Sequence, residues 1–339
     1  MKNLSAYIIF ILAALFLTAC APVKWSYQLN SPAKLQWPPP PSPAKIVYDG
    51  TLSAFKPTGE SMFTRIFGRG DSGRIIKPVA VAVGSDGRLA IADAALTGVH
   101  LYIPAKQRYM LLTHAGKLRF KSPVSVIFGA DLRLYVSDSI QRQIFVFDQQ
   151  GNFMRGISAV GNTTLKRPTG LTIRQDKNLL YVTDTTAHRL EIFDNQGNYR
   201  GHIGERGKEP GEFNFPTHIA SDAEGRIYVN DAMNFRVQIF SPRNKVLAVF
   251  GHHGNGSGDF AMSKGIAVDR KGIIYVVDTL FDRVQLFDMR GEYLLSFGGR
   301  GTGPGEFWLP SGIFIDHKTQ KLYVCDTYNK RLQIYTLHD

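Results

Sequence analysis

The sequence predicts an all-β fold in which repeated sheets close into a ring. Three observations support this prediction: an aspartate motif that recurs at a nearly constant spacing, short strand-like apolar runs on both sides of each motif, and a match between the N-terminal region and the last repeat. Helical periodicity is absent from the repeated part of the sequence.

The repeated motif is an aspartate at the end of a short apolar run. Successive copies stand 45 to 48 residues apart, which is the length of one four-stranded propeller blade. The copies are Asp93, Asp138, Asp184, Asp231, Asp278 and Asp326. They therefore predict a six-bladed β-propeller.

Strand-like runs flank each aspartate. An example before the motif is GIAVD at 265–269, and the runs after it include RVQIF at 236–240 and RLQIY at 331–335. The runs before the motif are apolar without strict alternation, as expected where both faces of a sheet pack on neighbouring blades. We therefore expect these runs to be the inner strands around a central channel.

The two ends of the repeat array predict how the ring closes. The sixth repeat ends after its third strand, whereas FTRIFGRG at 63–70 matches LLSFGGRG at 294–301, an outer strand with its glycine turn. The N-terminal segment is therefore expected to complete the last blade and to remove its open edge. We assign residues 45–339 to the propeller.

The later repeats resemble the NHL-repeat family. They contain a Gly-Glu-Phe turn, a proline, an inner strand, the aspartate, an asparagine and an arginine, most completely in residues 211–236 and 305–331. The resemblance covers roughly residues 61–339 and implies a six-bladed propeller. Repeats one and two depart from the pattern, because Gly98 and Gln143 stand where later repeats have arginine.

The repeated residues are expected to be structural. Each aspartate suits a turn in which its carboxylate accepts backbone hydrogen bonds, and the arginine five positions later suits an ion pair with it. Three glycines precede an acidic residue and a phenylalanine, and we expect positive φ at these glycines and burial of the rings between blades. These glycines are Gly211, Gly258 and Gly305. Cys325 is expected to be a buried thiol.

The N-terminus resembles a bacterial lipoprotein signal. Residues 1–19 hold Lys2 and then an apolar run, and the segment Leu17–Cys20 looks like a lipobox. We therefore predict that Cys20 is acylated, for example with palmitate, and anchors the protein in a membrane. Residues 20–44 are rich in proline and are expected to form an extended, lipidated linker. Because no acidic residue follows the cysteine, the sequence resembles lipoproteins on the periplasmic side of the outer membrane.

Composition limits the partners and the chemistry. The formal net charge of +12 favours anionic partners, but the basic residues are spread over loops and strand ends, so we expect no nucleic acid. Two cysteines cannot form a disulfide framework. The expected partners are a membrane, reached through the lipid, and an envelope protein or peptide, with the propeller itself monomeric.

The mouth of the predicted channel contains small and mildly polar residues. The candidate binding residues there are Thr169, Thr217, His218, Lys264 and Ser311. They include no carboxylate pair, no histidine cluster and no serine with a base, so we predict no catalytic residue, no metal and no cofactor.

Two functions from different classes fit these observations. The first is a lipid-anchored scaffold of the cell envelope that binds a protein, a peptide or a polymer. The second is a metal-dependent lyase or hydrolase with its site in the channel, because the blade pattern resembles that of peptidyl-hydroxyglycine lyases. Such lyases hold zinc with histidines of several inner strands, and a catalytic zinc needs about three protein ligands. Here His218 is the sole inner-strand histidine, so we expect the scaffold.

Overall fold

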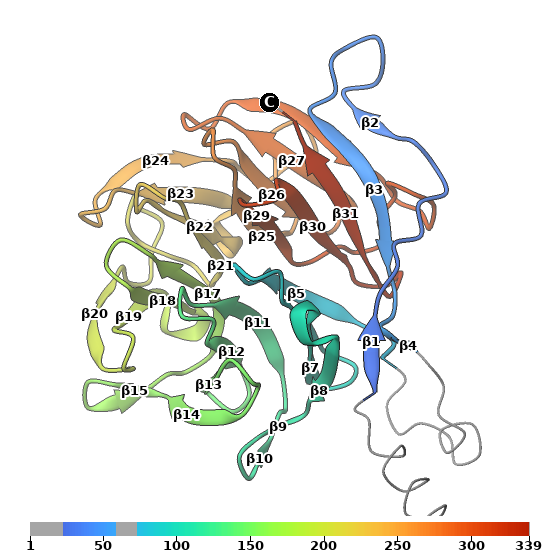
Figure 1. Ribbon diagram of the computed structural model, residues 1–339. Helices are drawn as coiled ribbons and strands as arrows, with labels where there is room; N and C mark the ends of the chain where they lie inside the picture. The colour runs from blue at the N-terminus through green and yellow to red at the C-terminus, as the bar shows by residue number, and fades with distance from the viewer. Residues whose placement is uncertain (1–22, 59–72, 339) are drawn as a thin grey trace, which may run out of the picture.

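The computed structural model describes residues 23–58 and 73–338, and it is a six-bladed β-propeller (Figure 1). Blade 1 contains β5 (Pro78–Val83), β6 (Leu89–Asp93), β7 (Gly98–Ile103) and β8 (Arg108–Leu112), and blade 2 contains β11 (Pro123–Phe128), β12 (Leu134–Asp138), β13 (Gln143–Phe147) and β14 (Phe153–Ile157). Blade 3 contains β17 (Pro168–Arg174), β18 (Leu179–Asp184), β19 (Arg189–Phe193) and β20 (Tyr199–Ile203), and blade 4 contains β21 (Pro216–Ser221), β22 (Ile227–Asp231), β23 (Arg236–Phe240) and β24 (Val246–Phe250). Blade 5 contains β25 (Ser263–Val268), β26 (Ile274–Asp278), β27 (Arg283–Phe287) and β28 (Tyr293–Gly298), and blade 6 contains β29 (Ile313–Asp316), β30 (Lys321–Asp326) and β31 (Arg331–Leu337) with the N-terminal strands β3 (Ile46–Leu52) and β2 (Gln36–Trp37).

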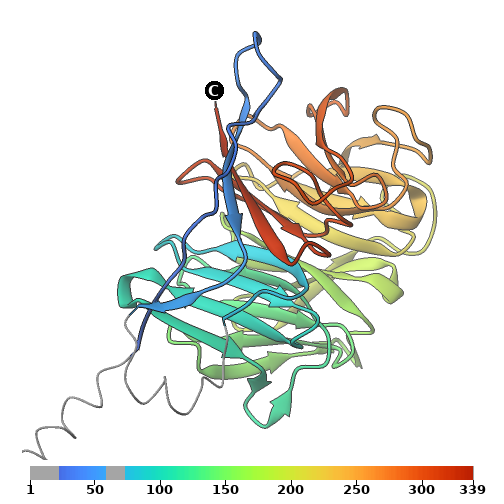
Figure 2. The same ribbon diagram turned by 90° about the vertical axis from the view of Figure 1, so that its right-hand side faces the viewer.

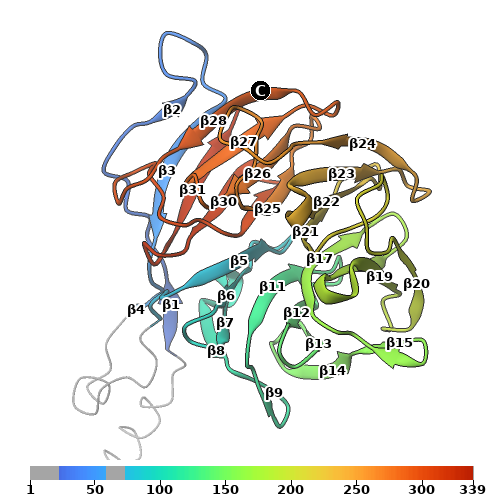
Figure 3. The same ribbon diagram turned by 180° about the vertical axis from the view of Figure 1, so that it is seen from behind.

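Each blade is an antiparallel meander that runs outward from the channel. The first strands of neighbouring blades contact one another all around the ring, including β29 with β5, so the ring is closed (Figure 3). The helical structure among the described residues consists of three short 3-10 turns, Pro104–Lys106, Thr185–Ala187 and Ala232–Asn234. The prediction of an all-β, six-bladed propeller is confirmed.

The hydrophobic core lies between the blades. One cluster of buried side chains joins Tyr228 and Val237 of blade 4 to Ile266 and Val276 of blade 5, and similar clusters lie between other pairs of blades. An inner strand therefore buries side chains on both of its faces. This packing explains why the inner strands are apolar without alternation.

An N-terminal strand closes the ring, as predicted, but it is not the predicted segment. The outer strand of blade 6 is β3, which pairs with β31 from Ile46 opposite Leu337 to Leu52 opposite Leu332. The assignment to residues 63–70 was wrong, because β3 occupies that place; residues 63–70 lie outside the described range. The prediction used a sequence match, whereas β3 is selected by the apolar side chains that it buries in the cluster between blades 5 and 6.

Side chains strengthen this closure. The ring of Tyr48 in β3 contacts the ring of Tyr335 in β31 at a centroid distance of 5.6 Å. Lys321 Nζ lies 2.7 Å from Asp49 Oδ2, and the Thr336 hydroxyl donates to the same carboxylate. The contacts therefore join residues that are 272 to 287 positions apart in the chain.

The segment before β3 lies along the side of the ring (Figure 2). The short strands β1 (Lys24–Ser26) and β4 (Lys56–Thr58) pair beside blade 1, where Trp25 contacts the ring of Tyr109 at 4.6 Å. Trp37 contacts Phe297 of blade 5 and Tyr335 of blade 6. The proline-rich segment predicted as a linker thus packs on the propeller through its tryptophans.

The repeated aspartates hold the start of each inner strand. In every blade the carboxylate accepts a hydrogen bond of 2.6–2.9 Å from a backbone N–H just before the first strand. The expected bonds to the following turn form in blades 1 and 2. The expected ion pair with arginine forms for Asp231 with Arg236 and for Asp326 with Arg331. Arg189 instead pairs with Glu191, and Arg283 lies over Phe281.

A glutamine in the third strand binds the glycine turn in blades 4 to 6. Gln238 Oε1 accepts a 2.8 Å hydrogen bond from the Gly211 N–H, and its Nε2 donates to the carbonyl of Glu212. Gln285 and Gln333 form the same pair of bonds. The predicted positive φ of Gly211, Gly258 and Gly305 and the burial of the following phenylalanines are confirmed. The sequence signal for this role was the glutamine at the centre of RVQIF, RVQLF and RLQIY.

The role of β3 as the closing strand can be tested by mutation. Tyr48→Ala removes a buried ring from the seam between β3 and β31, so the free energy of unfolding should fall by about 3 kcal/mol. Urea unfolding followed by circular dichroism measures this change. Val47→Thr, on the neighbouring half-buried position of the same strand, should cost much less, and equal stability of both variants would contradict the role of β3 as a closing strand.

Candidate functional site

One end of the ring carries most of the candidate site residues, and we call it the Asp-turn face. It comprises the segments before the inner strands and the turns that follow the six aspartates. In each blade, one of the first two residues after the aspartate donates its N–H to a carbonyl in the segment before the inner strand, at 2.9–3.0 Å in most blades and 3.1 Å for Tyr328 with Trp308. The six turns are therefore equivalent positions on one face.

Two of the predicted channel residues tie blades together. The Thr169 hydroxyl lies 2.8 Å from the Thr183 hydroxyl and donates to the carbonyl of Thr217 in the next blade at 2.9 Å. Ser311 is buried and hydrogen-bonds the Thr327 hydroxyl and the carbonyl of Val79. Both hydroxyls are thus occupied by protein partners.

The inner strands approach closely beside these residues. A Cβ at Gly170 would lie 2.7 Å from the carbonyl oxygen of Thr217, and one at Gly312 would lie 2.5 Å from that of Val79. Because both positions face backbone atoms, a larger residue would push the blades apart. The glycines therefore keep the first strands of neighbouring blades in contact around the channel.

Thr217, His218 and Lys264 remain half-buried. His218 Nδ1 lies 3.1 Å from the Thr217 hydroxyl. Burial and the positive charge of Lys264 lower the pKa of His218 to about 3, so its imidazole is neutral at physiological pH. Burial and the charge of Lys77 lower the pKa of Lys264. The inner strands thus bring these three side chains together in a positively charged environment.

The remaining titratable groups form no cluster of the metal-binding type. Within residues 23–58 and 73–338, no three His, Cys, Asp or Glu side chains lie together in a way that could hold a metal ion. Cys325 is buried, as predicted, and burial raises the pKa of its thiol. No helix in the described part of the chain is long and apolar enough to cross a membrane. Cys20, the predicted lipidation site, lies outside the described residues.

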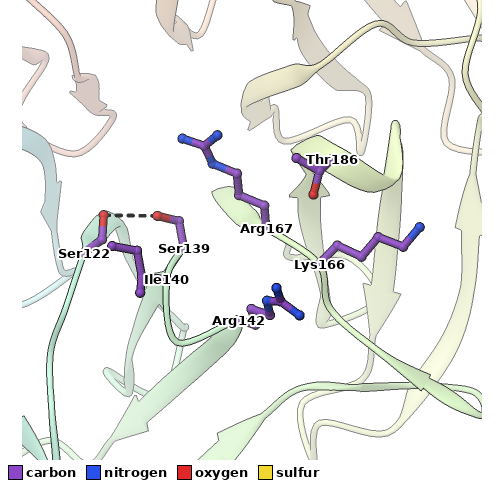
Figure 4. A pocket seen from close by; sticks show the side chains of 7 residues that line it. All are labelled: Ser122, Ser139, Ile140, Arg142, Lys166, Arg167 and Thr186. Carbon is purple, nitrogen blue, oxygen red and sulfur yellow. Dashed lines mark hydrogen bonds between the residues drawn. The ribbon is translucent and has the colours of Figure 1, made fainter.

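A pocket of about 460 Å³ opens between blades 2 and 3 on the Asp-turn face (Figure 4). Ser122 and Ser139 of blade 2 are joined by a 3.0 Å hydrogen bond on one side, and residues of blade 3 stand opposite them. The lining residues are Ser122, Ser139, Ile140, Arg142, Lys166, Arg167 and Thr186. None of them is acidic, so the pocket is strongly basic.

The three cations of this pocket have no ion pair with another described residue. In the part of the chain that the structure describes, the side chains of Arg142, Lys166 and Arg167 form no hydrogen bond or salt bridge. The nearby repeat carboxylates are buried and bind backbone N–H groups, those of Lys166 and Arg167 for Asp184 and that of Ser122 for Asp138. The cations therefore face the pocket with no acidic partner.

Blades 4 to 6 present a different surface on the same face. The second residue after the aspartate is a large exposed apolar residue in four blades, with exposed fractions of 61% for Ile140, 53% for Met233, 52% for Leu280 and 45% for Tyr328. Trp308 and Met262, which precede inner strands, are also exposed, and the Trp308 ring lies 5.7 Å from that of Tyr328. We call Met233, Met262, Leu280, Trp308 and Tyr328 the apolar arc.

The sequence contained a signal for this arc that motif reasoning did not use. The second position after each aspartate can be read directly from the repeats, as Ala95, Ile140, Thr186, Met233, Leu280 and Tyr328. The pocket had no such signal, because Arg142 belongs to a turn of one blade and Lys166 to the segment before the inner strand of the next.

Comparisons with known proteins agree with the fold. A family model described as "6-bladed beta-propeller" (DUF5128) matches residues 168–233 and 271–339, which together are less than half of the chain. No curated protein matches the sequence significantly. The chain is thus a six-bladed propeller, and membership of the NHL-repeat family stays a prediction.

Solved structures of similar shape have very different sequences. A gluconolactonase from Xanthomonas campestris aligns with a TM-score of 0.61 and 14% identity, over 92% of this chain and 100% of that one. A protein of unknown function from Bacteroides thetaiotaomicron aligns with a TM-score of 0.60 and 15% identity, over 79% of this chain and 71% of that one. Virginiamycin B lyase from Staphylococcus aureus aligns with a TM-score of 0.56 and 12% identity, over 78% of this chain and 96% of that one. At these identities the similarity shows the fold alone.

The low pKa of His218 predicts a pH dependence of stability. Between pH 6.5 and about 3, the unfolded chain binds a proton at this histidine that the folded chain does not bind, so stability falls as the pH falls through this range. His218→Gln removes this contribution, which is at most about 1.4 kcal/mol per pH unit. Urea titrations at several pH values should show the variant gaining stability relative to wild type toward low pH. The matched control is His202→Gln on an outer strand, and the same gain in both variants would contradict the effect.

Proposed function

We propose that this protein is a lipid-anchored binding module of the cell envelope whose apolar arc docks a partner protein. The observation that carries the proposal is the repetition of large exposed apolar side chains at one turn position, which gathers Met233, Leu280 and Tyr328 on one face. Contiguous exposed apolar residues on a soluble surface are typical of interaction sites. Methionine and aromatic residues are enriched at the centres of such interfaces.

Charge favours an acidic partner. Lys77 lies at the edge of the arc, with its Nζ 5.2 Å from the centroid of the Tyr328 ring. The whole chain carries a formal net charge of +12. Such a field speeds the association of an acidic protein and disfavours a basic one. A polymer is the alternative ligand for the same face.

Photo-cross-linking in cells tests the docking face. A photoreactive residue at Leu280 or Tyr328 should give one discrete protein adduct, because these side chains would contact the partner. The matched controls are Leu247 and Leu294, which have similar exposure but lie on the outer strands. Equal adducts from the outer strands, or a protease-resistant adduct from the face, would argue against a protein partner at the arc.

A triple variant tests whether the cross-linked adduct depends on the apolar arc. Replacing Met233, Leu280 and Tyr328 together by serine should abolish the adduct from a probe placed at Trp308. Because these positions are exposed, thermal stability should change little. Persistence of the adduct in the folded triple variant would contradict the proposed contact.

The anchor has its own test. Cys20→Ala should abolish incorporation of labelled palmitate and should move the protein from the membrane fraction to the soluble fraction, since no acyl chain then holds it. Cys325→Ala is the matched control and should leave both readouts unchanged, because Cys325 is buried in blade 6. Unchanged labelling and fractionation of Cys20→Ala would overturn the anchor.

A further inference from the structure

The pocket between blades 2 and 3 is distinct from the apolar arc. We propose that it binds the phosphoryl group of a small phosphate ester, through Arg142, Lys166 and Arg167. This inference does not depend on a partner protein at the arc, because the two surfaces involve different blades. It concerns a ligand that is small, anionic and phosphorylated.

The number and type of donors point to a phosphoryl group. Arginine and lysine are the residues that recognise phosphate, and their hydrogen bonds to an ionised oxygen are among the stronger ones in proteins. Two arginines and one lysine line the pocket together with the hydroxyls of Ser122, Ser139 and Thr186. A carboxylate offers two oxygens and a single negative charge to these cations, whereas a phosphoryl group offers three oxygens and nearly twice the charge.

The electrostatic surroundings favour an anion. No acidic residue lines the pocket, and the two closest repeat carboxylates are directed to backbone N–H groups. The buried imidazole of His188, in the turn that also carries Thr186, has a lowered pKa because of its burial and the positive charges of Arg206 and Lys166. A phosphate would therefore neutralise a cluster of cations that repel one another.

The shape of the pocket favours an ester over free phosphate. Its volume of about 460 Å³ lies in the usual range for small-molecule sites, about 300–1,000 Å³. Ile140 lines one side and is 61% exposed, so it offers apolar contact to the organic part of an ester. Arg142, Lys166 and Arg167 are exposed and line the same pocket, so their side chains can turn toward a phosphoryl group while the organic part lies against Ile140.

The pocket occurs where the repeat departs from its own pattern. The connections into blades 2 and 3 contain short hairpins, β9 (His114–Ala115) with β10 (Leu118–Arg119) and β15 (Ala159–Val160) with β16 (Thr163–Thr164). Blades 4 to 6 instead have the Gly-acid-Phe turn, which forms a parallel bridge to the preceding segment. Where blade 6 has Trp308 and Leu309 before its inner strand, blade 3 has Lys166 and Arg167. Blade 1 has one cation at these two positions, Lys77, and blade 2 also has one, Lys121, so the adjacent pair of cations is particular to blade 3.

Calorimetric titration of the full chain in detergent tests the proposal. Inorganic phosphate should bind one site per chain, glycerol 3-phosphate should displace it with equal stoichiometry, and added salt should weaken both. Arg167→Gln and Lys166→Gln should each weaken binding about tenfold, the loss expected for one charge-assisted hydrogen bond. Lys121→Gln, an exposed cation of blade 2 that does not line the pocket, should bind like wild type.

Several results would overturn the proposal. These are absence of saturable phosphate binding to the wild-type protein, unchanged affinity in both pocket variants, and binding of succinate as tight as that of glycerol 3-phosphate. Binding to vesicles distinguishes a lipid phosphate from a small soluble ester. If wild type and Arg167→Gln prefer phosphatidylglycerol over phosphatidylcholine to the same extent, lipid headgroups do not enter the pocket. A wild-type preference that Arg167→Gln loses assigns the site to a lipid phosphate. All variants change exposed side chains, so circular dichroism should show an unchanged fold.

Discussion

The ring depends on the buried aspartate at the end of each second strand. Its carboxylate accepts hydrogen bonds from the backbone just before the first strand of the same blade, and so determines where each inner strand begins. Five of these six residues have an exposed fraction of zero and the sixth, Asp184, of 1%. Since a buried carboxylate is costly without partners, the surrounding N–H groups are as necessary as the acid itself. Six repetitions of one interaction thus define a common face.

The side chains around the six aspartates differ from blade to blade, so one common backbone arrangement presents different surfaces. Blades 4 and 6 add an arginine to the carboxylate, and the turns of blades 4 to 6 carry exposed apolar side chains. Blade 2 has Gln143 in place of that arginine, and the repeat carboxylates of blades 2 and 3 accept hydrogen bonds from backbone N–H groups. The same scaffold therefore supports the apolar arc on blades 4 to 6 and a basic pocket between blades 2 and 3. This division suits a module that contacts two chemically different ligands.

Much of the fold could be predicted from the sequence because it depends on local repetition. The spacing of the aspartates defines the blades, and the glycine turns define the buried phenylalanines. The closing strand β3 was harder to predict, because its partner β31 is distant in the sequence. Which N-terminal segment closes the ring depends on which side chains fill the space beside β31. The sequence of residues 63–70 matches an outer strand with its glycine turn, but Ile46 and Tyr48 fill the cluster between blades 5 and 6. The candidate site was harder still: Thr169 and Ser311 are in the predicted segments, yet their hydroxyls are used between blades.

The closure by β3 also constrains how the chain folds. Asp49 and Thr336 are 287 residues apart, so β3 cannot form its pair until β31 has been made. Blades 1 to 5 are each built from consecutive strands and can form as synthesis proceeds, whereas blade 6 is completed only after β31 has been made. Contacts of such sequence separation slow folding, and until then β3 and β31 each expose a strand edge that can pair with other chains. Newly made protein is therefore most prone to aggregation before β3 pairs with β31.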